Sequence, residues 1–495
     1  MSMANVSCSR SVGRTGPGIP LRSPQTSFGV KDTPQHEVRW HVERDHVERH
    51  HQEQPEPRRH QRLGKLFTVR LQFIVLIVVC LSWGSAGAED YRYPYHDPYI
   101  ATATTSILNA DDVSPRLKRQ VVHVPVLPDR NQMRSLEGRG DLSLALYRQK
   151  HPAPLLFILS GIGSNPYFGL ATYFARLFHR EGFHLVILPS PMSWNFALAA
   201  SRSGAPGYAP EDARDLYEAM QKTLSVLRTR YNVEITGISF LGASLGALEG
   251  AYLSVIDAEE RKIGIEKYLL VNPPLDLSYA LRRVDQWDAK QDTFGRKKSK
   301  MLLARALAIV DSFSKDRRDD PAVFDRLAKA FGGFTTEEIQ FLIAEDLQAL
   351  LPELVYVTQV MDDQNVLKAP KDQTRRRLQE ANDWTFIDYF EKIAVPLWRV
   401  QAAEPHADLD SFTRRGSLAR ILDRLRSNQK VQIMHNADDF LADRKSIEAL
   451  KAALGDQVTL YPYGGHLGNL WYSENKKAVL KLFRTSGSAR AAVKR

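Results

Sequence analysis

Short apolar runs alternate with longer stretches of mixed composition from about position 120 to position 485. The apolar runs are six or seven residues long and lie at residues 121–126, 142–147, 154–159, 183–189, 235–241, 267–272, 430–435 and 458–463. In the stretches at residues 167–181, 211–231 and 444–454, apolar residues recur every three or four positions, which is typical of amphipathic helices. Strands that alternate with helices predict an α/β fold, in which helices cover both faces of a mostly parallel central sheet.

The pattern differs before residue 120. Residues 1–65 are rich in Ser, Pro, Arg, Glu and His, and we expect this polar leader to be disordered. Residues 66–88 contain a basic flank, a 13-residue apolar run and the triplet Ala86-Gly87-Ala88, the three parts of a secretory signal. The prediction is a signal peptide cleaved after Ala88, or an uncleaved signal anchor. Translation from near Leu66 or Val69 would leave residues 1–65 unmade. Residues 89–119, rich in Tyr, Pro and Asp, are expected to form an extended lead-in.

Charge and cysteine content restrict the possible functions. The formal net charge is +10, but residues 1–70 hold 12 Lys/Arg and 7 Asp/Glu, so half of the excess lies near the start of the chain. The remainder is only mildly basic, which predicts no nucleic-acid partner and at most peripheral attraction to an anionic membrane. Both cysteines, Cys8 and Cys80, precede the expected cleavage site, so cysteine redox chemistry and cysteine metal ligation are not expected.

The strongest chemical signal is the pentapeptide Gly242-Ala243-Ser244-Leu245-Gly246. It follows the apolar run at residues 235–241 and precedes a stretch of small and apolar residues at helical spacing. A G-x-S-x-G turn between a strand and a helix can expose a serine hydroxyl at the edge of a sheet. Ser244 is therefore the candidate nucleophile, although a packed turn that happens to contain serine would have the same sequence.

With this motif in place, the chain resembles the α/β-hydrolase superfamily from about Pro154 to Leu482. The resemblance implies a hydrolase core in two parts, residues 120–274 and 397–485, and a helical cap at residues 275–396 between the sixth and seventh strands. Residues 486–495 would form a basic tail. The apolar cap residues could line a lipid-like cleft or pack the cap helices on one another; they include Phe331, Phe334, Phe341 and Leu342.

The resemblance also implies an oxyanion hole. In many relatives a glycine-rich turn after the third strand supplies backbone N–H groups for the developing negative charge. This chain has Ser160 where a histidine is common, followed by Gly161-Ile162-Gly163. The N–H groups of Ile162 and Leu245 are the expected donors, unless the glycines serve only to reverse the chain.

The partners of the serine are implied in the same way. The acid of the triad aligns with Asp439, with Asp438 and Asp276 as the other candidates, and an Asp-Asp pair could also merely cap the following helix. The base is expected at His466, in Gly464-Gly465-His466, so that the order Ser244, Asp439, His466 is the one usual in this fold.

These residues predict an exported serine hydrolase, periplasmic or associated with the cell envelope, that cleaves carboxylic esters, with acyl lipids as one substrate class. No cofactor or metal is expected, because the sequence contains no G-x-x-x-x-G-K-[ST] and no H-E-x-x-H motif. The alternative is a catalytically inactive protein of the same fold that binds an envelope component or a partner. The sequence indicates neither the oligomeric state nor the acyl and alcohol groups of a substrate.

Overall fold

The computed structural model describes residues 91–109, 117–132, 136, 138–167, 169–313 and 320–484. The predicted polar leader, the predicted signal at residues 66–88 and the predicted basic tail at residues 486–495 lie outside these ranges. Among the helices of the described ranges, none combines the length and the apolar character that crossing a membrane would require.

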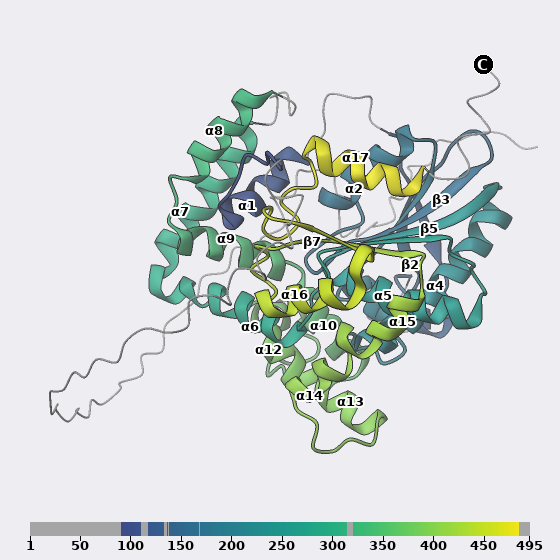
Figure 1. The fold of residues 1–495 in the computed structure, drawn as a ribbon. Coiled ribbons are helices and arrows are strands. Elements are labelled where there is room, and N and C mark those ends of the chain that lie inside the picture. Colours follow the sequence, from purple (N-terminus) through teal and green to yellow (C-terminus); the bar gives the residue numbers. More distant parts are fainter. Residues whose placement is uncertain are drawn as a thin grey trace, which may run out of the picture. The chain divides into compact units, whose positions relative to one another are not determined.

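An eight-stranded sheet forms the centre, with the order β1-β2-β4-β3-β5-β6-β7-β8 (Figure 1). The strands are β1 Gln120–Val124, β2 Leu142–Tyr147, β3 Ala153–Leu159, β4 His184–Leu188, β5 Ile235–Ala243, β6 Lys267–Val271, β7 Val431–Asn436 and β8 Val458–Tyr461. The pairs β1–β2 and β2–β4 are antiparallel, and the other pairs are parallel. The predicted mostly parallel α/β sheet is confirmed.

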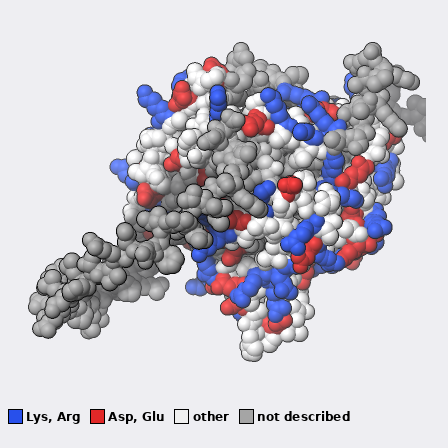
Figure 2. All heavy atoms as spheres, in the orientation of Figure 1, with Lys and Arg blue, Asp and Glu red and all other residues white. Residues whose placement is uncertain are grey.

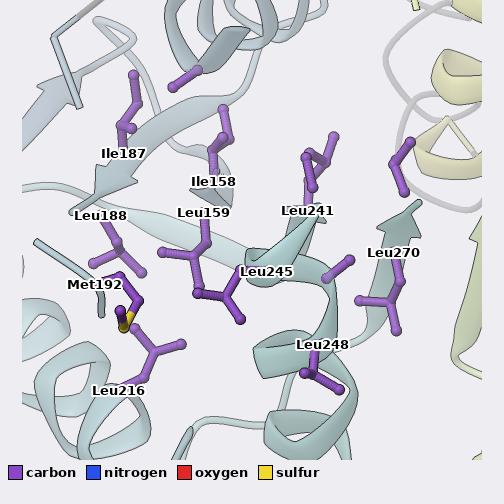
Figure 3. Close-up of a cluster of buried hydrophobic side chains, with 14 of the residues drawn as sticks. Ile158, Leu159, Ile187, Leu188, Met192, Leu216, Leu241, Leu245, Leu248 and Leu270 are labelled. Carbon is purple, nitrogen blue, oxygen red and sulfur yellow. The ribbon is translucent and has the colours of Figure 1, made fainter. Parts of the chain in front are cut away.

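Helices cover both faces of the sheet. Figure 1 shows α2 (Gly169–Arg180) and α17 (Ser473–Phe483) on one side, and α4 (Ala209–Arg230), α5 (Leu245–Glu260) and α16 (Arg444–Leu454) on the other. Because successive strand residues point to opposite faces, Leu159 and Leu188 point to the α4–α5 side, where Leu159 lies next to Leu245, whereas their chain neighbours Ile158 and Ile187 point to the other side (Figure 3). All five side chains are buried.

The described chain between β6 and β7 consists of helices and the loops that join them, with no strand. Its elements are α6 Leu277–Asp288, α7 Lys290–Ser312, α8 Pro321–Phe331, α9 Thr336–Gln348, α10 Leu351–Met361, α11 Thr374–Ala381, α12 Phe386–Tyr389, η3 Phe390–Ala394, α13 Val395–Gln401, α14 Leu409–Arg415, η4 Leu418–Ile421 and α15 Leu422–Ser427. α9 and α10 are two separate helices, because Pro352 fits only the first turn of α10. Helices also continue beyond residue 396, where the second part of the core was expected to begin.

The four apolar residues that the sequence offered for a lipid-like cleft are mostly buried. Phe331, Phe334 and Phe341 are buried, and Leu342 is partly buried. Phe341 packs edge-on against Phe294 of α7, and Phe331 packs against Phe334. These contacts agree with the alternative in which the helices of the insertion pack on one another.

The expected extended lead-in is partly wrong. Residues 98–108 form helix α1 (Pro98–Leu108), which begins at the N-cap Asp97 and has Pro98 in its first turn. The Asp97 carboxylate accepts hydrogen bonds from Tyr99 N and Ile100 N, at 2.8 and 2.9 Å. Asp followed by Pro is typical of the start of a helix. The composition of the segment, rich in Tyr, Pro and Asp, instead indicates an extended chain. The remaining short elements are η1 Pro128–Gln132, α3 Trp194–Ala199 and η5 Gly455–Gln457.

Charged side chains of both signs are interspersed on the described surface shown in Figure 2. Several form ion pairs between elements, such as Arg424 of α15 with Glu259 of α5 and Arg484 with Glu181. Exposed pairs of this kind each contribute about 0–1 kcal/mol, so the buried core, and not these pairs, holds the fold together.

Candidate active site

Ser244 lies in a sharp turn between a strand and a helix. β5 ends at Ala243 and α5 begins at Leu245, and the backbone angles of Ser244 are φ 55° and ψ −126°. A positive φ is unfavourable for a residue with a β-carbon, so the surrounding structure must hold this conformation. The turn has the strand, strained serine and helix of the nucleophile elbow that the sequence predicts.

Two glycines allow the turn to pack against the end of β3. A β-carbon at Gly246 would lie 2.3 Å from the carbonyl oxygen of Leu159, and one at Gly161 would lie 2.6 Å from the β-carbon of Ser244. Neither position has room for a side chain. The loop after β3 therefore lies directly against the serine, and it does so at Gly161, the first glycine of the turn in which the sequence predicts an oxyanion donor.

The hydroxyl of Ser244 meets His466. The Oγ–Nε2 distance is 2.9 Å, and on the other side of the ring Nδ1 lies 3.0 and 3.1 Å from the two carboxylate oxygens of Asp439. The structure thus brings together the three predicted side chains from the turn after β5, the turn after β7 and the loop after β8. Their catalytic roles stay predictions.

Asp439 is buried, with 3% of its surface exposed. Its carboxylate accepts hydrogen bonds from Asn272 Nδ2 at 2.7 Å and from Leu441 N at 3.0 Å. Burial by itself would raise the pKa of Asp439, but the charge and the hydrogen bond of His466 outweigh it and hold this pKa below its ordinary value. An ionised Asp439 orients the imidazole so that Nδ1 carries the proton and Nε2 can accept one from Ser244.

The two other candidate acids have different partners. Asp438 accepts hydrogen bonds from Gly464 N and Gly465 N, at 3.1 and 2.9 Å, so it supports the loop before His466. Asp276 is exposed and caps helix α6 by accepting from Tyr279 N at 3.1 Å. Of the three, Asp439 is the one whose carboxylate meets the imidazole.

The two expected oxyanion donors, Ile162 and Leu245, belong to segments that lie next to each other. Leu245 is the first residue of α5, where backbone N–H groups have no partner within the helix and the helix dipole favours negative charge. A β-carbon at Gly161 would lie 3.3 Å from Leu245 N, which brings the loop containing Ile162 next to this helix start. The assignment of Ile162 and Leu245 as donors stays a prediction.

Sequence reasoning missed two polar residues next to the triad. Asn272 directly follows β6, and its position at the carboxyl end of a parallel strand is a signal that could have drawn attention to it. Thr102 accepts a hydrogen bond from His466 N at 2.9 Å, and no local pattern indicates a contact between residues 364 positions apart. Within the ranges that the structure describes, no group of three or more His, Cys, Asp and Glu side chains is arranged to hold a metal ion.

Comparisons with known proteins concern the fold alone. No protein-family model and no curated protein matches the sequence. An esterase from Pyrococcus furiosus is 10% identical over 76% of this chain and 96% of its own, with a TM-score of 0.36. Carboxyl esterase 2 from Tuber melanosporum is 15% identical over 79% of this chain and 97% of its own, with a TM-score of 0.37. The thioesterase domain from the curacin biosynthetic pathway is 12% identical over 75% of this chain and 100% of its own, with a TM-score of 0.31.

The strand order and the position of the serine turn identify the architecture independently of these likenesses. A serine elbow follows β5, an acidic turn follows β7 and a histidine loop follows β8, in the order Ser244, Asp439, His466. The protein has the α/β-hydrolase fold.

Proposed function

We propose that this protein is a serine hydrolase that cleaves carboxylic esters through an acyl-enzyme intermediate. One observation carries the proposal, namely the continuous line from Ser244 Oγ through His466 to Asp439, with heavy-atom distances of 2.9 and 3.0 Å. A serine hydroxyl is a weak nucleophile at neutral pH, and a hydrogen-bonded imidazole oriented by a carboxylate is what activates it.

In the proposed reaction, His466 Nε2 takes the hydroxyl proton while Ser244 Oγ attacks the ester carbonyl carbon. The N–H groups of Leu245 and Ile162 stabilise the oxyanion, and Asp439 stabilises the imidazolium. Collapse of the tetrahedral intermediate breaks the bond to the alcohol oxygen, which receives the proton from His466. Water, deprotonated by His466, then attacks the acyl-enzyme and releases the carboxylic acid and Ser244.

We further propose that the protein is exported and acts in the periplasm or at the cell envelope, on acyl lipids or other envelope esters. The support is the signal-like sequence at residues 66–88. The buried phenylalanines of the helical insertion add nothing to the lipid preference. N-terminal sequencing of the native protein tests export, because a mature chain that begins after Ala88 is expected and peptides from residues 1–60 would contradict it.

A fluorophosphonate probe tests the catalytic proposal. The wild type should be labelled and should hydrolyse p-nitrophenyl esters, and Ser244→Ala should remove labelling and lower turnover about 10⁴-fold or more. Circular dichroism should show that the variant is folded. A folded wild type that is neither labelled nor active would overturn the proposal and favour a binding protein of the same fold. A series of esters with increasing acyl length would test the lipid preference, which fails if short soluble esters are the better substrates.

A further inference from the structure

The loop that carries His466 is held by side chains from other parts of the chain. This histidine loop, residues 462–472, connects β8 to α17. The bonds to its backbone include Gly464 N and Gly465 N to the Asp438 carboxylate, Asn436 Nδ2 to Gly465 O at 2.9 Å, His466 N to Thr102 Oγ1 at 2.9 Å, and Tyr93 OH to Gly468 O at 3.0 Å. Two of these partners, Tyr93 and Thr102, belong to the N-terminal segment, residues 91–109.

Thr102 is fixed from both sides. Its hydroxyl donates to Pro98 O, one turn earlier in α1, at 2.9 Å, and accepts the backbone N–H of His466. A hydroxyl has one proton and two lone pairs, so the bond to the helix sets the direction in which the oxygen can accept. The backbone of the general base is therefore tied to the backbone of α1 through one side-chain oxygen.

The loop also lies directly on α1, without side chains between them. A β-carbon at Gly465 would lie 2.1 Å from Pro98 O, and one at Gly468 would lie 2.6 Å from Ala101 O. Gly465 also has a positive φ of 55°, which glycine adopts readily. The glycines on either side of His466 are thus required by the approach of α1, in addition to any role in the turn.

The N-terminal segment is itself anchored at several places. Tyr91 OH donates to Asn475 Oδ1 of α17 at 2.8 Å, and Tyr95 OH donates to Phe324 O of α8 at 2.9 Å. The ring of Tyr99 stacks on Phe440, next to Asp439, with centroids 4.9 Å apart. Figure 1 shows α1 beside α8 and α9, so this helix lies between the helical insertion and the triad loops.

We propose that the N-terminal segment positions the general base, and that Thr102 is the positioning residue through which it acts. This inference rests on the proposed hydrolase function. Thr102 contacts the backbone of His466 and not the reacting atoms, so its effect is on the direction of the imidazole. An error of about 1 Å in the position of a reacting group can cost on the order of a hundredfold in rate, so loss of this one bond is sufficient to slow the chemical step.

The test compares two half-buried threonines of α1. Thr105 Oγ1 donates to Ala101 O at 3.1 Å, much as Thr102 Oγ1 donates to Pro98 O, but only Thr102 is bound to His466. We expect Thr102→Val to lower kcat about tenfold with little change in KM, and Thr105→Val to leave both unchanged. Thr102→Ser, which restores the oxygen, should recover most of the rate. Amide hydrogen exchange in residues 464–468 should be faster in Thr102→Val than in Thr105→Val.

The outcomes separate this inference from the proposed function. An active wild type whose kcat falls equally in Thr102→Val and Thr105→Val, or in neither, overturns the positioning role. Faster exchange in the histidine loop without a fall in kcat also overturns it, because the bond would then be structural only. A wild type without labelling or turnover overturns the hydrolase function itself, and the positioning role falls with it.

Discussion

The serine turn and the histidine loop meet where Ser244 Oγ lies 2.9 Å from His466 Nε2, yet the two segments are held in place in different ways. The turn belongs to the sheet, since Ser244 N donates to Val271 O of the neighbouring strand at 2.8 Å and Ala247 N donates to Ser244 O at 2.8 Å. The histidine loop follows the edge strand β8, and it is held by side chains that include those of Tyr93, Thr102, Asn436 and Asp438.

This difference predicts different consequences of mutation. A change that disturbs the serine turn disturbs the packing of β3, β5 and α5, so it should damage the whole fold. A change in a side chain that supports the histidine loop removes one hydrogen bond and leaves the sheet intact. The first kind should appear mainly in stability and the second mainly in turnover, except where a supporting side chain is also ionised and buried.

The largest effect is expected at the serine turn, for Gly246→Ala. Its β-carbon would lie 2.3 Å from Leu159 O, a backbone atom of the central strand β3 that cannot easily move aside. We expect the free energy of unfolding to fall by about 4 kcal/mol, or the variant not to fold. Urea unfolding followed by circular dichroism measures the difference.

Gly237→Ala, on the same strand β5, is the matched control. There the new β-carbon would meet the carboxylate of Glu266 at 2.8 Å, the end of a flexible side chain that can rotate away. Its stability should stay within about 1 kcal/mol of the wild type. Equal loss of stability in the two variants would show that the close approach of the serine turn to β3 is not what requires glycine at position 246.

The next largest effect concerns Asp438, which supports the histidine loop and has a partly buried carboxyl group. Burial raises the pKa of Asp438 from its ordinary value of 3.8 to about 6, although the bonds from Gly465 N and Gly464 N lower it. The folded protein therefore binds more protons than the unfolded chain between about pH 4 and pH 6, and stability falls as pH rises through this window. Allowing for its partial exposure, the change is on the order of 2 kcal/mol.

Asp438→Asn removes this titration. The difference in free energy of unfolding, wild type minus Asp438→Asn, should decrease by about 2 kcal/mol between pH 4 and pH 7. Chemical denaturation at several pH values measures it. If the free energies of unfolding of the two proteins change with pH in parallel, Asp438 has the same pKa in the folded and unfolded states. That result would contradict the expected effect of its burial on the pKa.

Much of the fold follows from local pattern. Every predicted apolar run overlaps a strand of the sheet, and residues 444–454 and 142–147 were predicted with the bounds that the structure gives. The reason is that buried strands and amphipathic helices carry periodicities that can be read over a few residues. The length of the helical insertion was less predictable, because α13 to α15 are short and lack a long apolar repeat.

The serine turn and the histidine loop also differ in how far the sequence predicts them. The residues next to Ser244 predict its role, because the turn that exposes the hydroxyl has a characteristic local sequence, G-x-S-x-G. The environment of His466 cannot be predicted from its neighbours in the sequence, because Thr102 and Tyr93 contact the histidine loop from a segment more than 360 positions earlier. Asp97-Pro98 indicates the start of α1, but nothing in the sequence indicates which loop the helix will contact.

The smallest effect is expected for Tyr93→Phe, which removes only the hydroxyl that donates to Gly468 O at 3.0 Å. Tyr93 is buried, with 2% of its surface exposed, so the carbonyl is left without this donor at a cost of about 1 kcal/mol. Loss of this bond lets the histidine loop move, which misaligns the imidazole of His466. We therefore expect kcat to fall by up to about fivefold while KM stays the same.

Tyr95→Phe provides the control, because Tyr95 is equally buried in the same segment but donates to Phe324 O of the helical insertion. The two variants should lose similar stability in thermal unfolding, and only Tyr93→Phe should lose turnover. A similar fall in kcat in both would indicate that the N-terminal segment acts on the site through its general packing. A fall in Tyr93→Phe alone would show that individual hydrogen bonds to the loop determine how well His466 is aligned with Ser244.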